Sequence, residues 1–100
     1  MQQEIKILMA GLSKVNIGET FSTHEHPYYQ LNHIVRGKFE FTVDGETFAA
    51  GAGDTILIPA NSIHSITDTG DEAGYYFEAK FSSFSKGVKE MCSDIDILKR

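Results

Sequence analysis

Hydrophobic and polar residues alternate along most of this chain, in short runs that are separated by turn residues. The clearest run is Lys38–Val43, in which Phe39, Phe41 and Val43 fall on one face and polar residues fall on the other. A period of two is typical of a half-buried β-strand. The same criteria predict strands over residues 5–9, 12–16, 29–35, 46–49, 55–58, 64–68 and 75–81.

Turn residues separate these runs, and together with the predicted strands they indicate the fold class. Asp44 and Gly45 predict a two-residue hairpin, because both residues tolerate positive φ. Helical spacing is found only in the tail, where Phe84, Val88 and Met91 predict a helix near residues 85–92. We therefore expect an all-β fold, a small antiparallel β-sandwich or barrel over residues 1–83, with a short C-terminal helix in residues 84–100.

Composition and charge narrow the classes of function. One hundred residues with 41% hydrophobic content suit a single domain. The net charge is −5 and no basic run is present, so we expect no nucleic acid to be contacted by these residues. Cys92 is the one cysteine, which rules out an internal disulfide and favours the cytoplasm. We find neither a signal peptide nor an apolar run that could span a bilayer, and expect no membrane partner.

Three of the four histidines lie in a regular frame. Gly18 is followed at fixed intervals by His24, His26, Gln30 and Gly37. These spacings resemble the first motif of the cupin superfamily, G-x5-H-x-H-x3-E-x6-G, with glutamine in place of the glutamate. The resemblance implies a double-stranded β-helix, and it implies that the frame residues line a pocket inside it.

A second frame begins fifteen residues after the first one ends. Gly53, Pro59 and His64 match the second cupin motif, G-x5-P-x-G-x2-H-x3-N. Asn61 replaces its middle glycine, and Asp68 replaces its final asparagine. Two linked motifs make the resemblance specific, and it covers residues 18 to 81.

The chemistry of the histidines leaves two possibilities open. Side chains two residues apart on a strand face the same way, so His24 and His26 point together if the strand is extended. Converging imidazoles either ligate a metal ion or form hydrogen bonds with a polar ligand. The alternative is that the three histidines are unrelated. We expect a divalent transition metal (Zn, Ni, Fe or Mn) at His24, His26, Gln30 and His64, although a neutral amide is a weaker ligand than a carboxylate.

Other residues near the frame have weaker assignments. Phe21, Tyr28 and Gln30 are candidate ligand-binding residues, although core packing also explains the aromatic ones. His33 has the opposite strand parity to Gln30 and is expected on the outside of the barrel. No further acid–base group is evident apart from Tyr28 and Glu25. We expect four aromatic residues in the core: Phe39, Phe41, Phe77 and Phe81.

The residues between His24 and Phe41, and those between Gly53 and Pro59, resemble the N-terminal sensor domain of AraC-type transcription regulators. That resemblance implies a module that binds a sugar or another small polar effector, such as a small acid, and forms a homodimer. DNA would then be contacted only by a C-terminal domain beyond these residues, with residues 84–100 beginning a dimerisation segment. The alternative is a stand-alone metal-dependent enzyme, a dioxygenase or a sugar isomerase. The shortage of acid–base groups favours the sensor.

Overall fold

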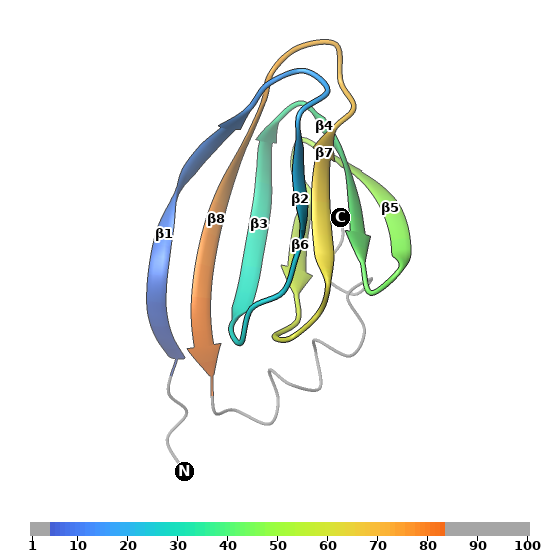
Figure 1. The fold of residues 1–100 in the computed structure, drawn as a ribbon. Coiled ribbons are helices and arrows are strands. Elements are labelled where there is room, and N and C mark those ends of the chain that lie inside the picture. The colour runs from blue at the N-terminus through green and yellow to red at the C-terminus, as the bar shows by residue number, and fades with distance from the viewer. Residues whose placement is uncertain (1–4, 84–100) are drawn as a thin grey trace.

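The computed structural model describes the backbone of residues 5–83 and the side chains of residues 6–21 and 25–82. These residues form eight strands in two four-stranded sheets (Figure 1). The strands are β1 (Ile5–Val15), β2 (Thr20–His24), β3 (Tyr29–Arg36), β4 (Lys38–Val43), β5 (Glu46–Gly51), β6 (Thr55–Ile58), β7 (His64–Asp68) and β8 (Gly74–Ser83).

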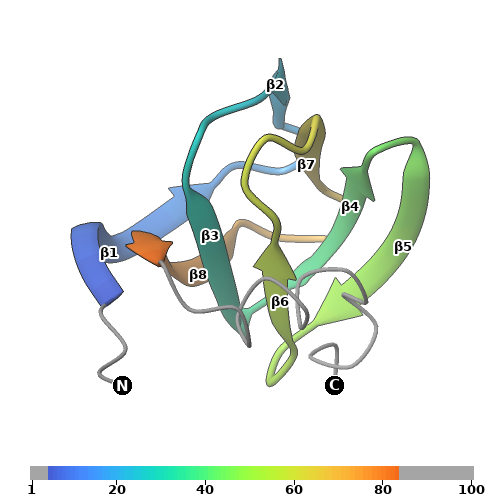
Figure 2. The same ribbon diagram turned by 90° about the horizontal axis from the view of Figure 1, so that it is seen from below.

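The two sheets face each other and enclose the core. One has the strand order β1-β8-β3-β6 and the other has the order β2-β7-β4-β5, with antiparallel neighbours throughout. Seen from below, they form the two walls of an open barrel (Figure 2). The expected all-β antiparallel fold is thus confirmed. The helix predicted near residues 85–92, and the whole segment 84–100, lie outside the described residues, and among the residues described no helix is long and apolar enough to cross a membrane.

Alternating apolar positions fill the space between the sheets. Phe39 and Phe41 on β4 are fully buried, as their spacing predicts. Ile34 on β3 and Ile56 and Ile58 on β6 meet them from the other sheet. The remaining buried members of this cluster are Val15, Val43, Ala50, Ile66 and Tyr76.

The face of β8 that turns inward is the opposite of the one expected. Tyr76 and Glu78 are 3% and 8% exposed, whereas Phe77 is 41% exposed and lies outside the core. Gly74 explains this parity, because a Cβ atom on Gly74 would overlap the Phe39 ring, so this position must face the core. Phe81 is partly buried, in a smaller apolar cluster where its ring stacks on Tyr29 at 5.6 Å between centroids.

Strand boundaries near the N-terminus also differ from the prediction. The two runs expected over residues 5–9 and 12–16 are one strand, β1, with a register shift between Ile7 and Met9. An extra residue of this kind changes which side chains face the core, so no single alternation spans the strand. Strand β2 was not predicted at all; it pairs with β7.

Turn residues adopt the backbone angles that their types allow. Asp44 and Gly45 have φ values of 48° and 84°, which is the geometry of the predicted hairpin turn. Asn61 has a φ of 64° at the position where the motif has glycine. Asparagine is among the few residues that tolerate this left-handed conformation, so the replacement keeps the turn.

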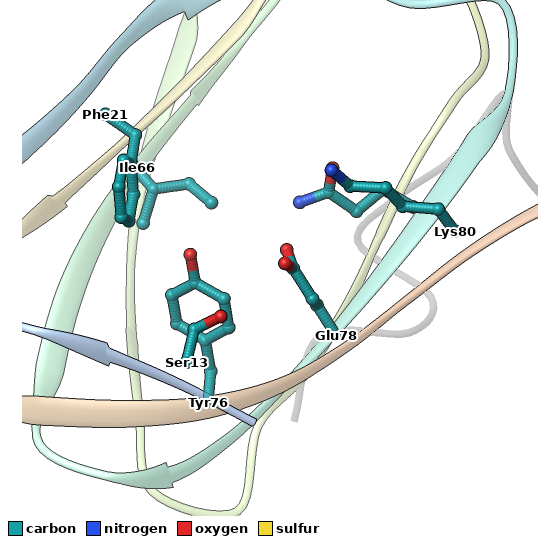
Figure 3. Close-up of a pocket in the computed structure, with 7 residues that line it drawn as sticks. Ser13, Phe21, Ile66, Tyr76, Glu78 and Lys80 are labelled. Atoms are coloured by element: carbon teal, nitrogen blue, oxygen red, sulfur yellow. The ribbon is translucent and has the colours of Figure 1, made fainter. Parts of the chain in front are cut away.

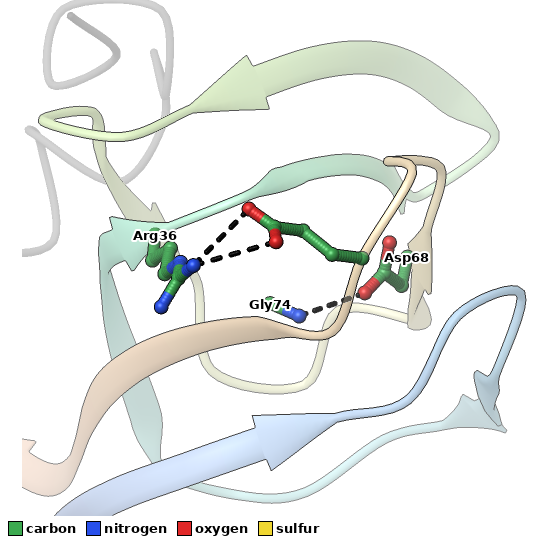
Figure 4. Close-up of polar contacts among 4 residues, drawn as sticks. Arg36, Asp68 and Gly74 are labelled. Carbon is green, nitrogen blue, oxygen red and sulfur yellow. Dashed lines mark hydrogen bonds and ion pairs between the residues drawn. The ribbon is translucent and has the colours of Figure 1, made fainter.

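Asp68 holds the loop between β7 and β8 (Figure 4). Its buried carboxylate accepts hydrogen bonds from the backbone N–H groups of Gly70 and Gly74, at 2.8 and 2.9 Å. The Arg36–Glu72 pair beside it is 3.3 Å long, but its side chains are 61% and 65% exposed, so it adds little stability. The loop is therefore fixed mainly by Asp68.

Candidate functional site

Two of the frame histidines meet at the end of the barrel. His26 lies in the loop between β2 and β3, and His64 begins β7. The N–H of Asn61 donates to the carbonyl of His26 at 2.8 Å, which ties this loop to the one that precedes β7. The two imidazole rings are both buried, with centroids 4.8 Å apart and planes 68° from parallel. Residues 38 positions apart in the sequence thus share one site, as the two motifs imply.

Main-chain carbonyls fix the orientation of both rings. His26 Nδ1 is 2.9 Å from the Tyr28 carbonyl oxygen, and His64 Nδ1 is 3.3 Å from that of Ser62. A carbonyl oxygen only accepts, so Nδ1 is the donor in each ring. In a neutral imidazole, Nε2 then carries the lone pair. Metal-ligating histidines commonly donate their second N–H to a carbonyl in this way.

Gln30 continues the polar network into the barrel. Its Oε1 is 3.1 Å from His26 Nε2, and its Nε2 donates to Asn32 Oδ1 at 2.9 Å. Asn32 Nδ2 is buried and has no hydrogen-bond partner among the described residues. In this orientation, the lone pair of His26 Nε2 faces an amide oxygen. Turning both amides over would resolve the conflict, because Gln30 would donate to His26 and Asn32 would donate to Gln30.

A cation bound by both His26 Nε2 and Gln30 Oε1 would resolve the same conflict without turning either amide. His26 Nε2 and Gln30 Oε1 are 3.1 Å apart, so both could contact one bound cation. The donor set of imidazoles and an amide suits a divalent transition metal and does not select one.

The position of His24 is described only in its backbone, which pairs with that of His64 across β2 and β7. Among the side chains that are described, no three His, Cys, Asp or Glu residues gather as a metal site. The predicted ligand set contains only two such residues with described side chains, His26 and His64. A site with three histidines therefore depends on His24.

A cavity of about 360 Å³ opens beside this network, between the two sheets (Figure 3). Tyr76, Glu78 and Lys80 of β8 point into it from one sheet, and Phe21 and Ile66 face them from the other. One wall is thus polar and titratable, and the opposite wall is apolar. Ser13 and Gln30 complete the lining.

Tyr76 remains protonated over the whole ordinary pH range. Its side chain is almost fully buried. Burial raises the pKa of the Tyr76 phenol well above its ordinary value, and the charges of Glu78 and Glu19 raise it further. The phenol can therefore act as a hydrogen-bond donor to a molecule in the cavity.

Glu78 is an acceptor with no partner in the described part of the chain. It is 8% exposed, and no hydrogen bond or ion pair joins it to another described residue. Its carboxylate faces the cavity, and a largely buried carboxylate is costly unless water or another donor reaches it there. Glu78 can therefore accept a hydrogen bond from a molecule bound in the cavity.

The other candidate residues have different surroundings. The Tyr28 ring stacks on His26, with centroids 3.9 Å apart, and lies 5.9 Å from Lys80 Nζ. Phe21 lines the cavity and is 39% exposed. His33 is on the outer side of its sheet, where Nδ1 is 2.8 Å from Thr55 Oγ1, as its parity predicts. Whether Phe21, Tyr28 or Gln30 binds a ligand stays a prediction.

Sequence reasoning missed the polar wall of the cavity. Tyr76, Glu78 and Lys80 share one strand parity, whereas the residues of this strand that were expected in the core, Phe77 and Phe81, have the other parity. Gly74 continues the same parity, and a glycine at a strand start can mark a close approach to the core. The shortage of acid–base groups inferred from the sequence is therefore wrong.

Residues 11–79 match the sequence model of a family described as "Cupin domain". Two curated relatives are similar to this chain. It is 38% identical over 63 residues to "Polyketide synthase CurC" of Streptomyces cyaneus, a match that covers 62% of this chain and 41% of the relative. It is 34% identical over 62 residues to "Protein SchB" of Streptomyces halstedii, covering 61% and 45%. The matches thus span less than half the length of either relative.

The fold also resembles solved structures. The cupin domain of Cnp3 from Schizosaccharomyces pombe superimposes with a TM-score of 0.72 at 21% sequence identity. The match covers 82% of this chain and 66% of that one. At this level of identity, the likeness concerns the arrangement of the strands alone.

Proposed function

The chain belongs to the cupin family, and on that premise we propose that it binds a divalent transition metal and a small oxygenated organic molecule side by side. Gln30 carries this proposal. Its Oε1 is 3.1 Å from His26 Nε2, and the same side chain lines the cavity with Tyr76 and Glu78. A molecule in the cavity would therefore lie next to the histidines. The proposed metal ligands are His24, His26, His64 and Gln30.

An enzyme is the function that we favour. When bound, the metal would polarise a carbonyl or hydroxyl oxygen as a Lewis acid. Glu78 supplies a carboxylate that can accept a proton, and Tyr76 supplies a neutral donor. Phe21 and Ile66 supply an apolar surface that displaces water from the bound molecule. These groups provide the acid–base chemistry that a catalytic site needs.

The class of substrate is suggested by the relatives. One carries the name polyketide synthase, and polyketides are carbon chains rich in carbonyl and hydroxyl groups. The cavity offers complementary groups to such a molecule, because its polar wall can both donate and accept hydrogen bonds. We therefore propose a substrate of the polyketide type.

A sensor domain of the AraC type is the second candidate. Gln30 favours it, because a neutral amide compensates less metal charge than the glutamate of the motif would. In that function the same cavity would hold a sugar or a small acid without converting it, and DNA would be bound by another segment. A ligand that raises the melting temperature but is recovered unchanged would support this candidate over the enzyme.

Metal analysis tests the proposal. Protein purified without a histidine tag or chelators is expected to contain about one transition metal ion per chain by plasma mass spectrometry. His26→Ala and His64→Ala are expected to reduce the metal content at least tenfold. His33→Ala is the matched control and should keep it, because His33 lies on the outer side of its sheet. Metal content that is equal in all four proteins would contradict the assigned ligands.

A further inference from the structure

The cavity contains hydrogen-bonding side chains that are not among the proposed metal ligands. Glu78 is more than nine-tenths buried, and its carboxylate has no hydrogen-bond or ion-pair partner among the described residues. Lys80 follows on the same face of β8, yet the two side chains form no ion pair in the part of the chain that is described. A carboxylate only accepts hydrogen bonds, so the missing partner must be a donor.

The position of Tyr76 narrows the kind of donor group that can serve Glu78. Tyr76 precedes Glu78 by two residues on β8, so both side chains face the cavity (Figure 3). A buried phenol is a donor that also needs an acceptor. One hydroxyl group of a ligand satisfies both side chains, because its hydrogen is donated to Glu78 while its oxygen accepts from Tyr76. A carboxylate ligand would be repelled by Glu78, and a simple ketone would leave Glu78 without a donor.

The opposite wall defines the rest of the ligand. Phe21 and Ile66 present an aromatic ring and a branched aliphatic side chain to the same space. Flat apolar groups pack well on such a surface. A cavity of about 360 Å³ has room for one or two fused six-membered rings.

We infer that the cavity selects a neutral aromatic hydroxyl compound, a phenol or naphthol, whose hydroxyl group bridges Glu78 and Tyr76 while its ring lies against Phe21 and Ile66. This inference rests on the proposed function, since it names the kind of molecule that the cavity takes. It assigns Glu78 and Tyr76 as the residues that determine ligand specificity.

Fluorescence titration with 2-naphthol and its methyl ether, 2-methoxynaphthalene, tests this assignment. The chain contains no tryptophan, so naphthalene fluorescence is read with little background. The two probes share a ring system, but the ether cannot donate a hydrogen bond. We expect the wild-type protein to bind 2-naphthol at least tenfold more tightly than the ether. In Glu78→Gln, the ratio of the two dissociation constants is expected to fall below three. Tyr76→Phe removes the donor to the oxygen of both probes, so it is expected to weaken the binding of both and to leave their ratio near the wild-type value.

Glu40→Gln is the matched control, because Glu40 is an exposed glutamate on β4. It should keep the wild-type ratio. Equal affinity of the wild-type protein for both probes, or an unchanged ratio in Glu78→Gln, would overturn the inference. Metal content measured on the same preparations separates the two proposals: metal retained without hydroxyl selection overturns only the present one. Circular dichroism confirms that each variant is folded, and the two substitutions at different positions guard against a local folding defect.

Discussion

A single carboxylate shows how one residue can organise a loop. Asp68 is 2% exposed and accepts hydrogen bonds from the N–H groups of Gly70 and Gly74. Hydrogen bonds to a charged acceptor are stronger than neutral ones. Asp68 occupies the last position of the second motif, where the family pattern has asparagine. Its role in this chain is therefore to close the loop that leads into β8, and so into the polar wall of the cavity.

Removal of this carboxylate should destabilise the protein. We expect Asp68→Ala to lower the free energy of unfolding by about 2–3 kcal/mol, because two backbone N–H groups lose a charged acceptor. Urea denaturation followed by circular dichroism measures the change. Asp71→Ala, in the same loop but exposed, should change it by less than about 0.5 kcal/mol. A loss of similar size in both variants would show that Asp68 has no special role.

The elements differ in how well the sequence predicts them. Strand β4 and its hairpin were predicted correctly, because Phe39 and Phe41 alternate with polar residues and Asp44-Gly45 favours one turn type. Strand β8 was placed correctly but with the wrong face inward. Both of its faces carry apolar or aromatic residues, since the outer one holds Phe81 against a second cluster. Hydrophobicity alone therefore could not decide which face is buried.

The candidate site was likewise predicted from the sequence only in part. The frame spacings predict that His26 and His64 meet, and the structure places their rings 4.8 Å apart. The cavity wall of Tyr76 and Glu78 was not predicted, because buried polar groups look like solvent-exposed ones in an alternation pattern. Tertiary packing around Gly74, and not local sequence preference, sets their direction.

Gly74 therefore determines which face of the whole strand β8 turns toward the core. We expect Gly74→Ala to lower the free energy of unfolding by about 1–3 kcal/mol, because the added methyl group overlaps the buried Phe39 ring. Gly11→Ala on β1 is the control, since a Cβ atom there has no heavy atom within 4 Å. Thermal denaturation compares the two. Equal melting temperatures would contradict the packing argument.

At the scale of the whole molecule, the two sheets contribute different chemistry to one interior. The sheet that contains β3 and β8 supplies Gln30, Tyr76 and Glu78, while the other supplies Phe21 and Ile66. The outer side of the first sheet leaves Leu12 and Phe77 65% and 41% exposed. The homodimer expected from the sequence stays a prediction. Because the Tyr76 phenol is buried on folding, its titration is coupled to the stability of the entire barrel.

Tyr76 makes this coupling measurable at high pH. Burial raises its pKa in the folded protein, while the unfolded chain keeps a value of about 10. Above that pH the unfolded state releases the tyrosine proton and the folded state retains it, so stability falls as pH rises. We expect the free energy of unfolding to fall more steeply above about pH 10 in the wild type than in Tyr76→Phe, by up to about 1.4 kcal/mol per pH unit. Tyr75→Phe is the control, because Tyr75 lies on the opposite face of β8, and it should retain the wild-type dependence of stability on pH. Urea denaturation at successive pH values measures this dependence. The same dependence in all three proteins would contradict the coupling.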